Sequence, residues 1–247
     1  MSEYDYKKGK ERIVNILDND LEIVEQNELP TDNSFTFTNG YYSWVTGIFV
    51  DIRNSTSLFA DKDKEKVAKV IRTFTSETIE ILRNDDNLRE IGIRGDCVYA
   101  IYTTPYKNDI YEAADKTFYI NTYMSMLNKL LAERSLPKIN VGIGMSTDRE
   151  LVVKAGRKDV GINSKVWIGK AVTRASNLSS IGNKNGNDSL VFSRLSYDNF
   201  IEELEENDKD KNPREWFACR ENSEGVYYTA NIVKSTFDKW IKDGMPD

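Results

Sequence analysis

The sequence contains no histidine. This absence excludes histidine general bases, Ser-His-Asp and Cys-His nucleophile systems, and zinc sites with imidazole ligands. The only two cysteines, Cys97 and Cys219, lie far apart and lack the spacing of a metal-binding motif. Any chemistry must therefore depend on carboxylates, cations and hydroxyl groups, and we expect a reducing, cytoplasmic setting.

Long apolar runs and an excess of positive charge are also missing. No stretch approaches the roughly 20 apolar residues that cross a membrane, and the N-terminus lacks an apolar signal region. The net charge is -6, whereas nucleic-acid binders generally cluster Lys and Arg against phosphates. We therefore expect no membrane association and no stable nucleic-acid partner.

The chain is long enough for one substantial core, so we expect one catalytic domain with extensions. We assign residues 1–40 to an N-terminal extension, residues 41–195 to the catalytic domain, and residues 196–247 to C-terminal strands and a helix packed on the same domain. The apolar patterns predict the order strand, helix, hairpin, helix, hairpin. This order is typical of a ferredoxin-like α+β fold, an antiparallel sheet with helices on one face.

Individual elements follow from the same patterns. We predict helices at 11–23, 63–83 and 108–135, a strand at 44–52, and a hairpin of strands 88–94 and 97–103. A second hairpin is predicted from strands 139–145 and 150–155. Residues 166–169 then lead into a late helix through Leu178.

Two aspartates stand out against this background. Asp51 ends an apolar strand-like run, and Asp96 lies at the bend of the first hairpin. A buried backbone can hold such carboxylates rigidly against a cation. The pair is therefore the best candidate for a metal site.

The motifs around these aspartates, Phe49-Val50-Asp51-Ile52 and Gly95-Asp96, resemble those of the class III nucleotidyl cyclases, and the resemblance extends over residues 44–195. It implies that Asp51, Asp96 and the carbonyl of Ile52 bind two divalent ions, Mn²⁺ or Mg²⁺. It also implies that the 3′-hydroxyl of a nucleoside triphosphate attacks its own α-phosphorus and expels pyrophosphate. That reaction requires no histidine.

The turn after Asp51 is expected to bind phosphate oxygens, because a helix begins there with free backbone N–H groups. Arg94 shares a strand face with Asp96 and either approaches the nucleotide, faces solvent or joins an ion pair. Arg53 either binds the substrate or is an exposed cation beside an acidic turn. The predicted substrate-binding residues are Phe49, Arg53, Asn54, Ser55, Thr56, Arg94 and Arg174.

The expected base-reading positions differ from those of purine cyclases, which carry a lysine and an acidic or small polar residue there. The aligned residues are Gly92 and Val166, and neither can hydrogen-bond a purine. The segment 166–179 instead resembles the bacterial pyrimidine cyclases of the Pycsar anti-phage systems. This resemblance implies UTP or CTP as substrate, with UTP favoured, and cyclic UMP or cyclic CMP as a messenger to a separate cell-killing effector.

The late helix differs from the wider family at its catalytic positions. Where the family carries an asparagine and a basic residue, this chain has Thr173 and Asn177. We predict Thr173 and Asn177 as catalytic residues beside Asp51 and Asp96. Arg174, Lys170 or a residue of a second subunit could replace the family's basic residue. The family also places each active site at the interface of a homodimer.

Two alternatives remain open from the sequence. One is a purine cyclase with an unusual base pocket. The other is a catalytically silent cyclase-like domain that senses nucleotide or phage protein, which Thr173 and Asn177 favour. A diguanylate-forming enzyme is disfavoured, because the Gly-Asp hairpin continues with Cys97 and Val98.

Overall fold

The computed structural model describes residues 3–56, 63–157, 160–209 and 211–246. Within these ranges lies a nine-stranded sheet of order β3-β4-β2-β5-β7-β9-β8, with β1 paired to β2 and β6 paired to β5. None of the described helices is both long and apolar enough to span a bilayer. The strands are β1 (Glu22–Glu25), β2 (Asn39–Ile52), β3 (Leu88–Arg94), β4 (Cys97–Thr103), β5 (Val141–Arg157), β6 (Ile162–Gly169), β7 (Leu190–Ser193), β8 (Ala218–Asn222) and β9 (Gly225–Ala230).

The helices follow the predicted order. Asp63 caps α3 by accepting a hydrogen bond of 3.2 Å from the backbone of Lys66. The α-helices are α1 (Tyr6–Leu17), α3 (Lys64–Arg83), α4 (Lys107–Glu133), α5 (Lys170–Ile181), α6 (Arg194–Asn207) and α7 (Ser235–Lys242), and the short 3-10 helices are Asp32–Ser34 and Pro213–Trp216.

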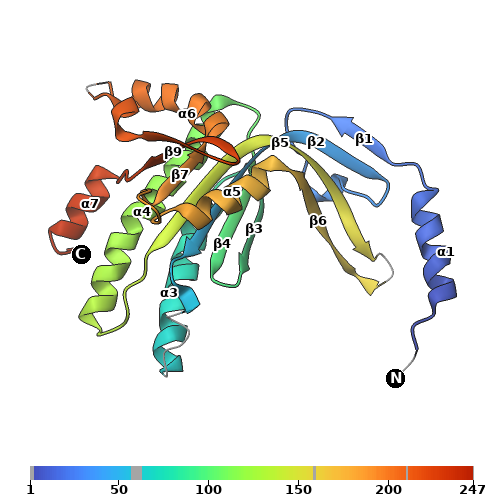
Figure 1. Cartoon of the computed structure of the whole chain (residues 1–247), viewed down its shortest axis with the longest axis horizontal. Helices are drawn as coiled ribbons and strands as arrows, with labels where there is room; N and C mark the ends of the chain where they lie inside the picture. Colours follow the sequence, from blue (N-terminus) through green and yellow to red (C-terminus); the bar gives the residue numbers. More distant parts are fainter. Residues whose placement is uncertain (1–2, 57–62, 158–159, 210, 247) are drawn as a thin grey trace.

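Two long strands connect a helix-covered body to a projecting arm (Figure 1). One edge of β2 pairs first with β1 and then with β4, while its other edge pairs with β5 over residues 40–52. Likewise β5 pairs with β7 in the body and with β6 in the arm. The aspartate-bearing end of β2 lies in the body, between β4 and β5.

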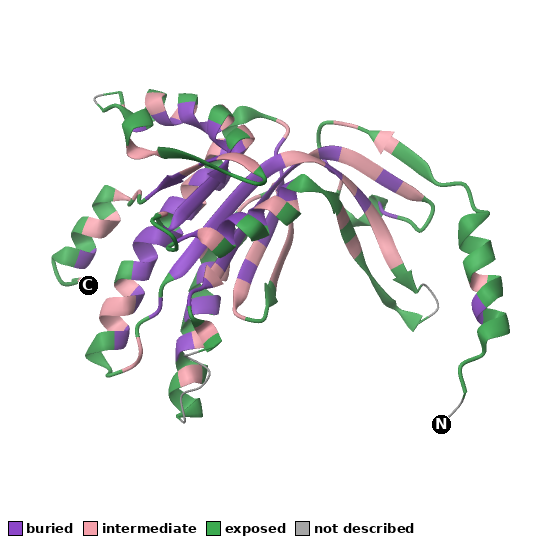
Figure 2. Cartoon of the chain, in the orientation of Figure 1, coloured by how far each residue is buried: buried purple, intermediate pink, exposed green. Residues whose placement is uncertain are grey.

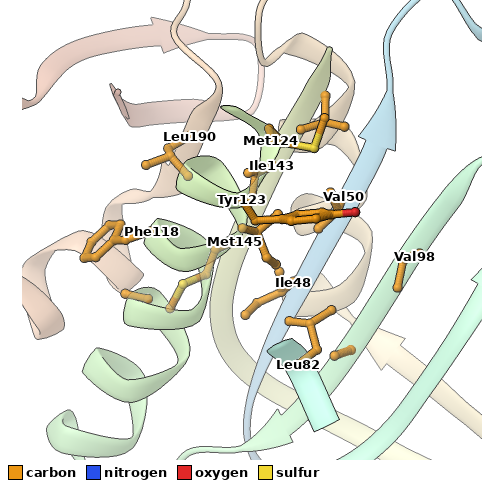
Figure 3. Packing of buried hydrophobic residues seen from close by; sticks show 14 of the residues in the cluster. Ile48, Val50, Leu82, Val98, Phe118, Tyr123, Met124, Ile143, Met145 and Leu190 are labelled. Atoms are coloured by element: carbon orange, nitrogen blue, oxygen red, sulfur yellow. The ribbon is translucent and has the colours of Figure 1, made fainter. Parts of the chain in front are cut away.

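The main core lies between the sheet and the helices α3, α4 and α6. Alternate residues of β2, including Ile48 and Val50, point into it and belong to one cluster with Leu82 of α3 and Phe118 of α4 (Figure 3). Burial is concentrated on the central strands and the inner side of α4, whereas α1 is largely exposed (Figure 2). Close packing on this face fixes the strands that carry the aspartates.

Helix α5 covers the opposite face of the same sheet. A Cβ atom at Gly142 would lie 2.1 Å from the carbonyl oxygen of Ser179, and one at Gly144 would lie 2.1 Å from that of Ala175. These glycines therefore let α5 lie directly on the strands. The predicted α+β fold is confirmed, with the addition that α5 lies on the face opposite α3 and α4.

Two predicted elements differ from the structure. Residues 139–155 do not form a hairpin, because β5 runs unbroken from Val141 to Arg157 and the reversal comes before β6. The polar residues that suggested a turn belong to the sheet, where Thr147 shares a hydrogen bond of 2.8 Å with Thr46. The first helix spans 6–17 instead of 11–23, since Asp5 caps it by accepting a hydrogen bond of 3.0 Å from Lys8.

The terminal segments both join the central sheet. Strand β1 pairs parallel to β2, and Leu29, completely buried, packs with Phe35 and Val152 on the arm. At the other end, β9 pairs with β7, and β8 forms the far edge. The domain boundaries at residues 40 and 195 stay predictions.

Candidate active site

The structure brings Asp51 and Asp96 together at one end of the sheet. Asp51 is the second-last residue of β2 and lies opposite Cys97 of β4, the residue that follows Asp96. The backbone N–H of Ile52 donates to the carbonyl oxygen of Asp96 at 3.5 Å. Between the strands, Gly95 takes a φ of 64°, a conformation that favours glycine. The Gly95-Asp96 turn therefore places Asp96 beside the end of β2.

The local charges set the protonation of this pair. Burial raises the pKa of the Asp51 carboxyl, and the charge of Asp96 raises it further, while Arg53 and Lys184 act in the opposite direction. Burial and the charge of Asp51 raise the pKa of the Cys97 thiol to about 12. At neutral pH Cys97 is therefore a neutral thiol, and the ionisable ligands at this position are the carboxylates.

Arg53 is a buried component of the site, so its interpretation as an exposed cation is wrong. Its side chain is 4% exposed and forms an ion pair with the Asp51 carboxylate. Nη1 donates to the carbonyl of Ser180 in α5 at 2.6 Å, and Nε donates to the carbonyl of Asp51 at 3.2 Å. The guanidinium thus contacts both Asp51 and the end of α5, and it fixes their relative position.

The turn after Asp51 has the expected form as far as it is described. Asn54 has a φ of 55°, in the left-handed region, and Ser55 and Thr56 begin a helical turn. Ser57, which we also placed in this turn, lies outside the described residues. Asn54 and Thr56 are exposed beside Asp51, so phosphate binding by Asn54, Ser55 and Thr56 remains a prediction.

An aromatic and acidic wall lines the same face of the sheet beyond Asp51. Phe49 stacks on Tyr99 with ring centroids 5.3 Å apart. The Tyr99 hydroxyl donates to Glu90 at 2.9 Å, and Trp167 Nε1 donates to the other oxygen of Glu90 at 2.9 Å. A Cβ atom at Gly92 would lie 2.7 Å from the Tyr99 hydroxyl. The aligned position of the purine-reading lysine is therefore covered by a tyrosine.

Arg94 belongs to this wall. It is exposed, and its charge counteracts the burial and the Glu90 carboxylate that together raise the pKa of Tyr99 to about 12. This places Arg94 on the face that carries Tyr99, as strand alternation predicted. Sequence reasoning did not select Glu90 and Tyr99, although the alternation of Glu90, Gly92 and Arg94 indicates a shared face.

The predicted residues of α5 make contacts within the chain. The Thr173 hydroxyl donates to the carbonyl of Gly169 at 3.2 Å. Arg174 donates to the carbonyl of Val226 at 2.8 Å, and the Asn177 amide donates to Glu224 at 2.5 Å. Arg174 thus holds the β8–β9 turn against α5. Thr173 and Asn177 are exposed on the outer side of this helix, so their catalytic role remains a prediction.

The residues present fit a divalent cation. Asp51 and Asp96 are close enough for one charge to raise the pKa of the other, a repulsion that a cation would relieve. In the described part of the chain no group of three or more His, Cys, Asp or Glu side chains could hold a metal. Asp51, Asp96 and the carbonyl of Ile52 would supply oxygen ligands, and phosphate oxygens or water would complete the shell.

A separate hollow of about 990 Å³ lies between α4, α6 and α7. Tyr111, Trp216 and Trp240 line it, together with the ion pair of Asp115 and Lys234 at 2.6 Å. It includes neither aspartate. We assign the active site from the carboxylate geometry, because the size of a hollow carries no chemistry by itself.

Residues 38–187 match the adenylate and guanylate cyclase catalytic domain. A uridylate cyclase from Treponema porcinum is 52% identical over 246 residues, which cover 99% of this chain and 83% of that protein. A uridylate cyclase from Gulbenkiania mobilis is 26% identical over 249 residues, which cover 97% of this chain and 96% of that protein.

Among solved structures, the adenylyl cyclase CyaB from P. aeruginosa superposes with a TM-score of 0.61 over 77% of this chain and 95% of that chain. The two sequences are 20% identical, so this likeness shows the fold alone. The family match, in contrast, includes both aspartates, the β3–β4 hairpin and α5. It confirms the resemblance that the motifs indicated: the chain belongs to the family of adenylate and guanylate cyclase catalytic domains, the class III cyclases.

Proposed function

We propose that this protein is a pyrimidine nucleotide cyclase that converts UTP into 3′,5′-cyclic UMP and pyrophosphate. The observation that carries the proposal is the adjacency of Asp51 and Asp96 at the end of β2 and the β3–β4 turn. Class III cyclases in general depend on divalent metal ions. The carboxylate pair is where this chain would bind them.

In the proposed reaction the 3′-oxygen forms a bond to the α-phosphorus, and the bond to the bridging oxygen of pyrophosphate breaks. The hydroxyl proton is released to water. Two divalent ions, Mn²⁺ or Mg²⁺, bound by Asp51, Asp96 and the carbonyl of Ile52, would favour the ionised 3′-hydroxyl and neutralise the triphosphate. The chain itself holds the two carboxylates at a fixed spacing through strand pairing and Arg53.

The preference for a pyrimidine is supported by the wall around Gly92. The ring of Tyr99 covers this residue, and of β6 it is Trp167 that reaches the wall, through its hydrogen bond to Glu90. A purine would lose its hydrogen-bond partners and meet the tyrosine ring, whereas a single-ring base needs less room. The names of the two uridylate cyclase relatives favour UTP over CTP as the substrate.

The active enzyme is proposed to be a homodimer with active sites at the subunit interface. Thr173 and Asn177 lie on the exposed side of α5, where they are available to the Asp51 and Asp96 of a second subunit. A two-fold dimer would create two equivalent sites. Nucleoside triphosphates are cytoplasmic, and we place the enzyme there.

The product is proposed to act as a second messenger. Through the resemblance to the Pycsar cyclases, we assign the chain to anti-phage defence, in which cyclic UMP activates a separate cell-killing effector. Synthesis during infection and loss of protection in an Asp51→Ala strain are the expected observations.

Incubation of the purified protein with UTP, CTP, ATP or GTP and Mn²⁺ tests the substrate assignment. We expect cyclic UMP as the main product. Rapid ATP turnover without UTP or CTP turnover would contradict the pyrimidine assignment. Nucleotide binding without any cyclic product would favour the silent sensor, which the engagement of Asn177 by Glu224 makes the second candidate.

A further inference from the structure

Glu150 is a buried carboxyl group for which the proposed reaction has no use. It lies within β5 and is 0% exposed. Its Oε1 accepts a hydrogen bond of 3.1 Å from the backbone N–H of Val172 in α5. Its Oε2 has no hydrogen-bond partner among the described residues. A buried, half-satisfied carboxyl is costly, so its retention needs a reason.

Burial raises the pKa of this carboxyl, while hydrogen bonds from the backbone of Val172 and Ala171 act in the opposite direction. Asp148 is the charged group that adds to the rise. Glu150 therefore accepts hydrogen bonds from backbone N–H groups in the first turn of α5.

Helix α5 begins without a capping side chain of its own. Its N-cap residue is Gly169, which has an extended φ of 162° and no side-chain cap. Ala171 and Val172 occupy the second and third helical positions, whose N–H groups an N-cap side chain normally binds. Glu150 thus accepts the hydrogen bond that residue 169 would otherwise accept.

Glu150 also occupies the space of that missing cap. Gly169 is paired with Glu150 across β5 and β6. A Cβ atom at Gly169 would lie 2.8 Å from the carboxyl carbon and 2.8 Å from Oε2 of Glu150. One carboxylate fits in this volume, and the chain supplies it from the strand instead of the helix.

The far end of α5 is fixed by the site itself. Arg53, paired with Asp51, donates to the carbonyl of Ser180 at 2.6 Å. The helix is thus held by Glu150 at its first turn and by Arg53 at its last. Between these two points it carries Thr173 and Asn177.

We propose that Glu150 is a positioning residue that caps α5 from the neighbouring strand and so fixes where Thr173 and Asn177 lie. Its catalytic consequence rests on the proposed cyclase function. The capping itself does not, because it has a readout of its own in the exchange of the Ala171 and Val172 amide protons.

The test moves the cap from the strand to the helix. Glu150→Ala removes it, and the double variant Glu150→Ala/Gly169→Asp restores a carboxylate at the N-cap. Gly169→Asp alone is the matched control, expected to lower the melting temperature because two carboxylates then compete for one volume. Ile241→Ala, which changes the buried residue of α7, controls for a general loss of stability.

In Glu150→Ala we expect hydrogen exchange at Val172 to rise about tenfold, the typical effect of losing a cap. We expect kcat to fall about tenfold or more with KM for UTP nearly unchanged, because the metal-binding aspartates are not on α5. The double variant should recover both amide protection and kcat. Ile241→Ala should lower the melting temperature with kcat retained.

Three results would overturn the proposal. Unchanged exchange at Val172 in Glu150→Ala would show that Glu150 does not cap α5. Restored protection without restored kcat in the double variant would show that Glu150 acts by another route. A stable Glu150→Ala variant with wild-type kcat would show that capping is only structural. A wild-type protein without cyclic product would instead contradict the proposed function, and the exchange measurement would still decide the capping.

Discussion

Arg53 donates a hydrogen bond of 2.6 Å to the carbonyl of Ser180, the second-last residue of α5. The same guanidinium is paired with Asp51. A single buried cation therefore joins the proposed metal-binding carboxylate on β2 to the helix that carries Thr173 and Asn177. Arginine suits this position, since its planar fork can donate in several directions and stays charged.

Replacing Arg53 should change the pH dependence of the enzyme. Arg53 lowers the pKa of Asp51 against burial, so Arg53→Gln should raise that pKa. Metal binding requires the ionised carboxylate, and the acidic limb of kcat/KM should therefore move to higher pH. The measurement is the pH–rate profile at a fixed, subsaturating Mn²⁺ concentration. Arg149→Gln, an arginine on the arm that donates to Tyr42, should leave the profile unchanged. An unmoved acidic limb in Arg53→Gln would show that Arg53 does not tune Asp51.

The buried carboxyl of Glu150 predicts a pH dependence of stability. Burial raises its pKa above the ordinary value of a glutamate in the folded chain, so protonation favours the folded state. That contribution is present below about pH 4.5 and is lost as the pH rises through the folded pKa. Glu150→Gln, which mimics the protonated form, should therefore gain stability relative to wild type as the pH rises. Melting temperatures of both proteins from pH 4.5 to 8 measure this difference, and a constant difference would contradict it.

The aspartate pair and the order of elements could be predicted because they depend on local signals. Asp51 lies at the end of an apolar strand, and Gly95 marks a tight turn. A hairpin beside that strand brings Asp96 close to Asp51, so the proximity of the two aspartates could be predicted. The environment of Arg53 could not be predicted, since Ser180 is distant in sequence and reaches it only through the packing of α5.

The continuity of β5 escaped prediction for a related reason. Thr147 lies in the polar stretch 146–149 between the two predicted strands, yet it bonds to Thr46, and Glu150, which follows this stretch, bonds to α5. Their partners come from other elements, so the sequence of β5 alone does not show them. The stacking of Phe49 on Tyr99 likewise depends on a register that only the paired strands define.

Tyr99 should control the choice of base. Tyr99→Ala removes the ring above Gly92, and we expect the ratio of kcat/KM for UTP to that for ATP to fall about ten- to a hundredfold. Tyr99→Phe keeps the ring and loses the hydrogen bond to Glu90, so it should retain most of the preference. Steady-state rates with both triphosphates provide the comparison. An unchanged ratio in Tyr99→Ala would exclude the ring as the element that rejects purines.

Complementation should reveal whether active sites form between subunits. Asp51→Ala and Thr173→Ala/Asn177→Ala should each be inactive alone. An equimolar mixture should recover about a quarter of the wild-type rate, because half of the dimers then contain one intact site of two. The measurement is cyclic UMP formation after exchange of subunits. Lack of recovery, with mixed dimers demonstrated, would place all three residues in the site of one subunit.

We propose Asp51 and Asp96 as the metal-binding centre of a nucleotide cyclase. The most direct measurement is the initial rate of cyclic UMP formation from UTP as a function of Mn²⁺ for wild type, Asp51→Asn and Asp96→Asn. The exposed Asp20→Asn serves as the matched control. We predict a metal-dependent rate in wild type and in the control, and a loss of at least about a hundredfold in each active-site variant at unchanged melting temperature. Full activity in Asp51→Asn or Asp96→Asn would contradict the claim.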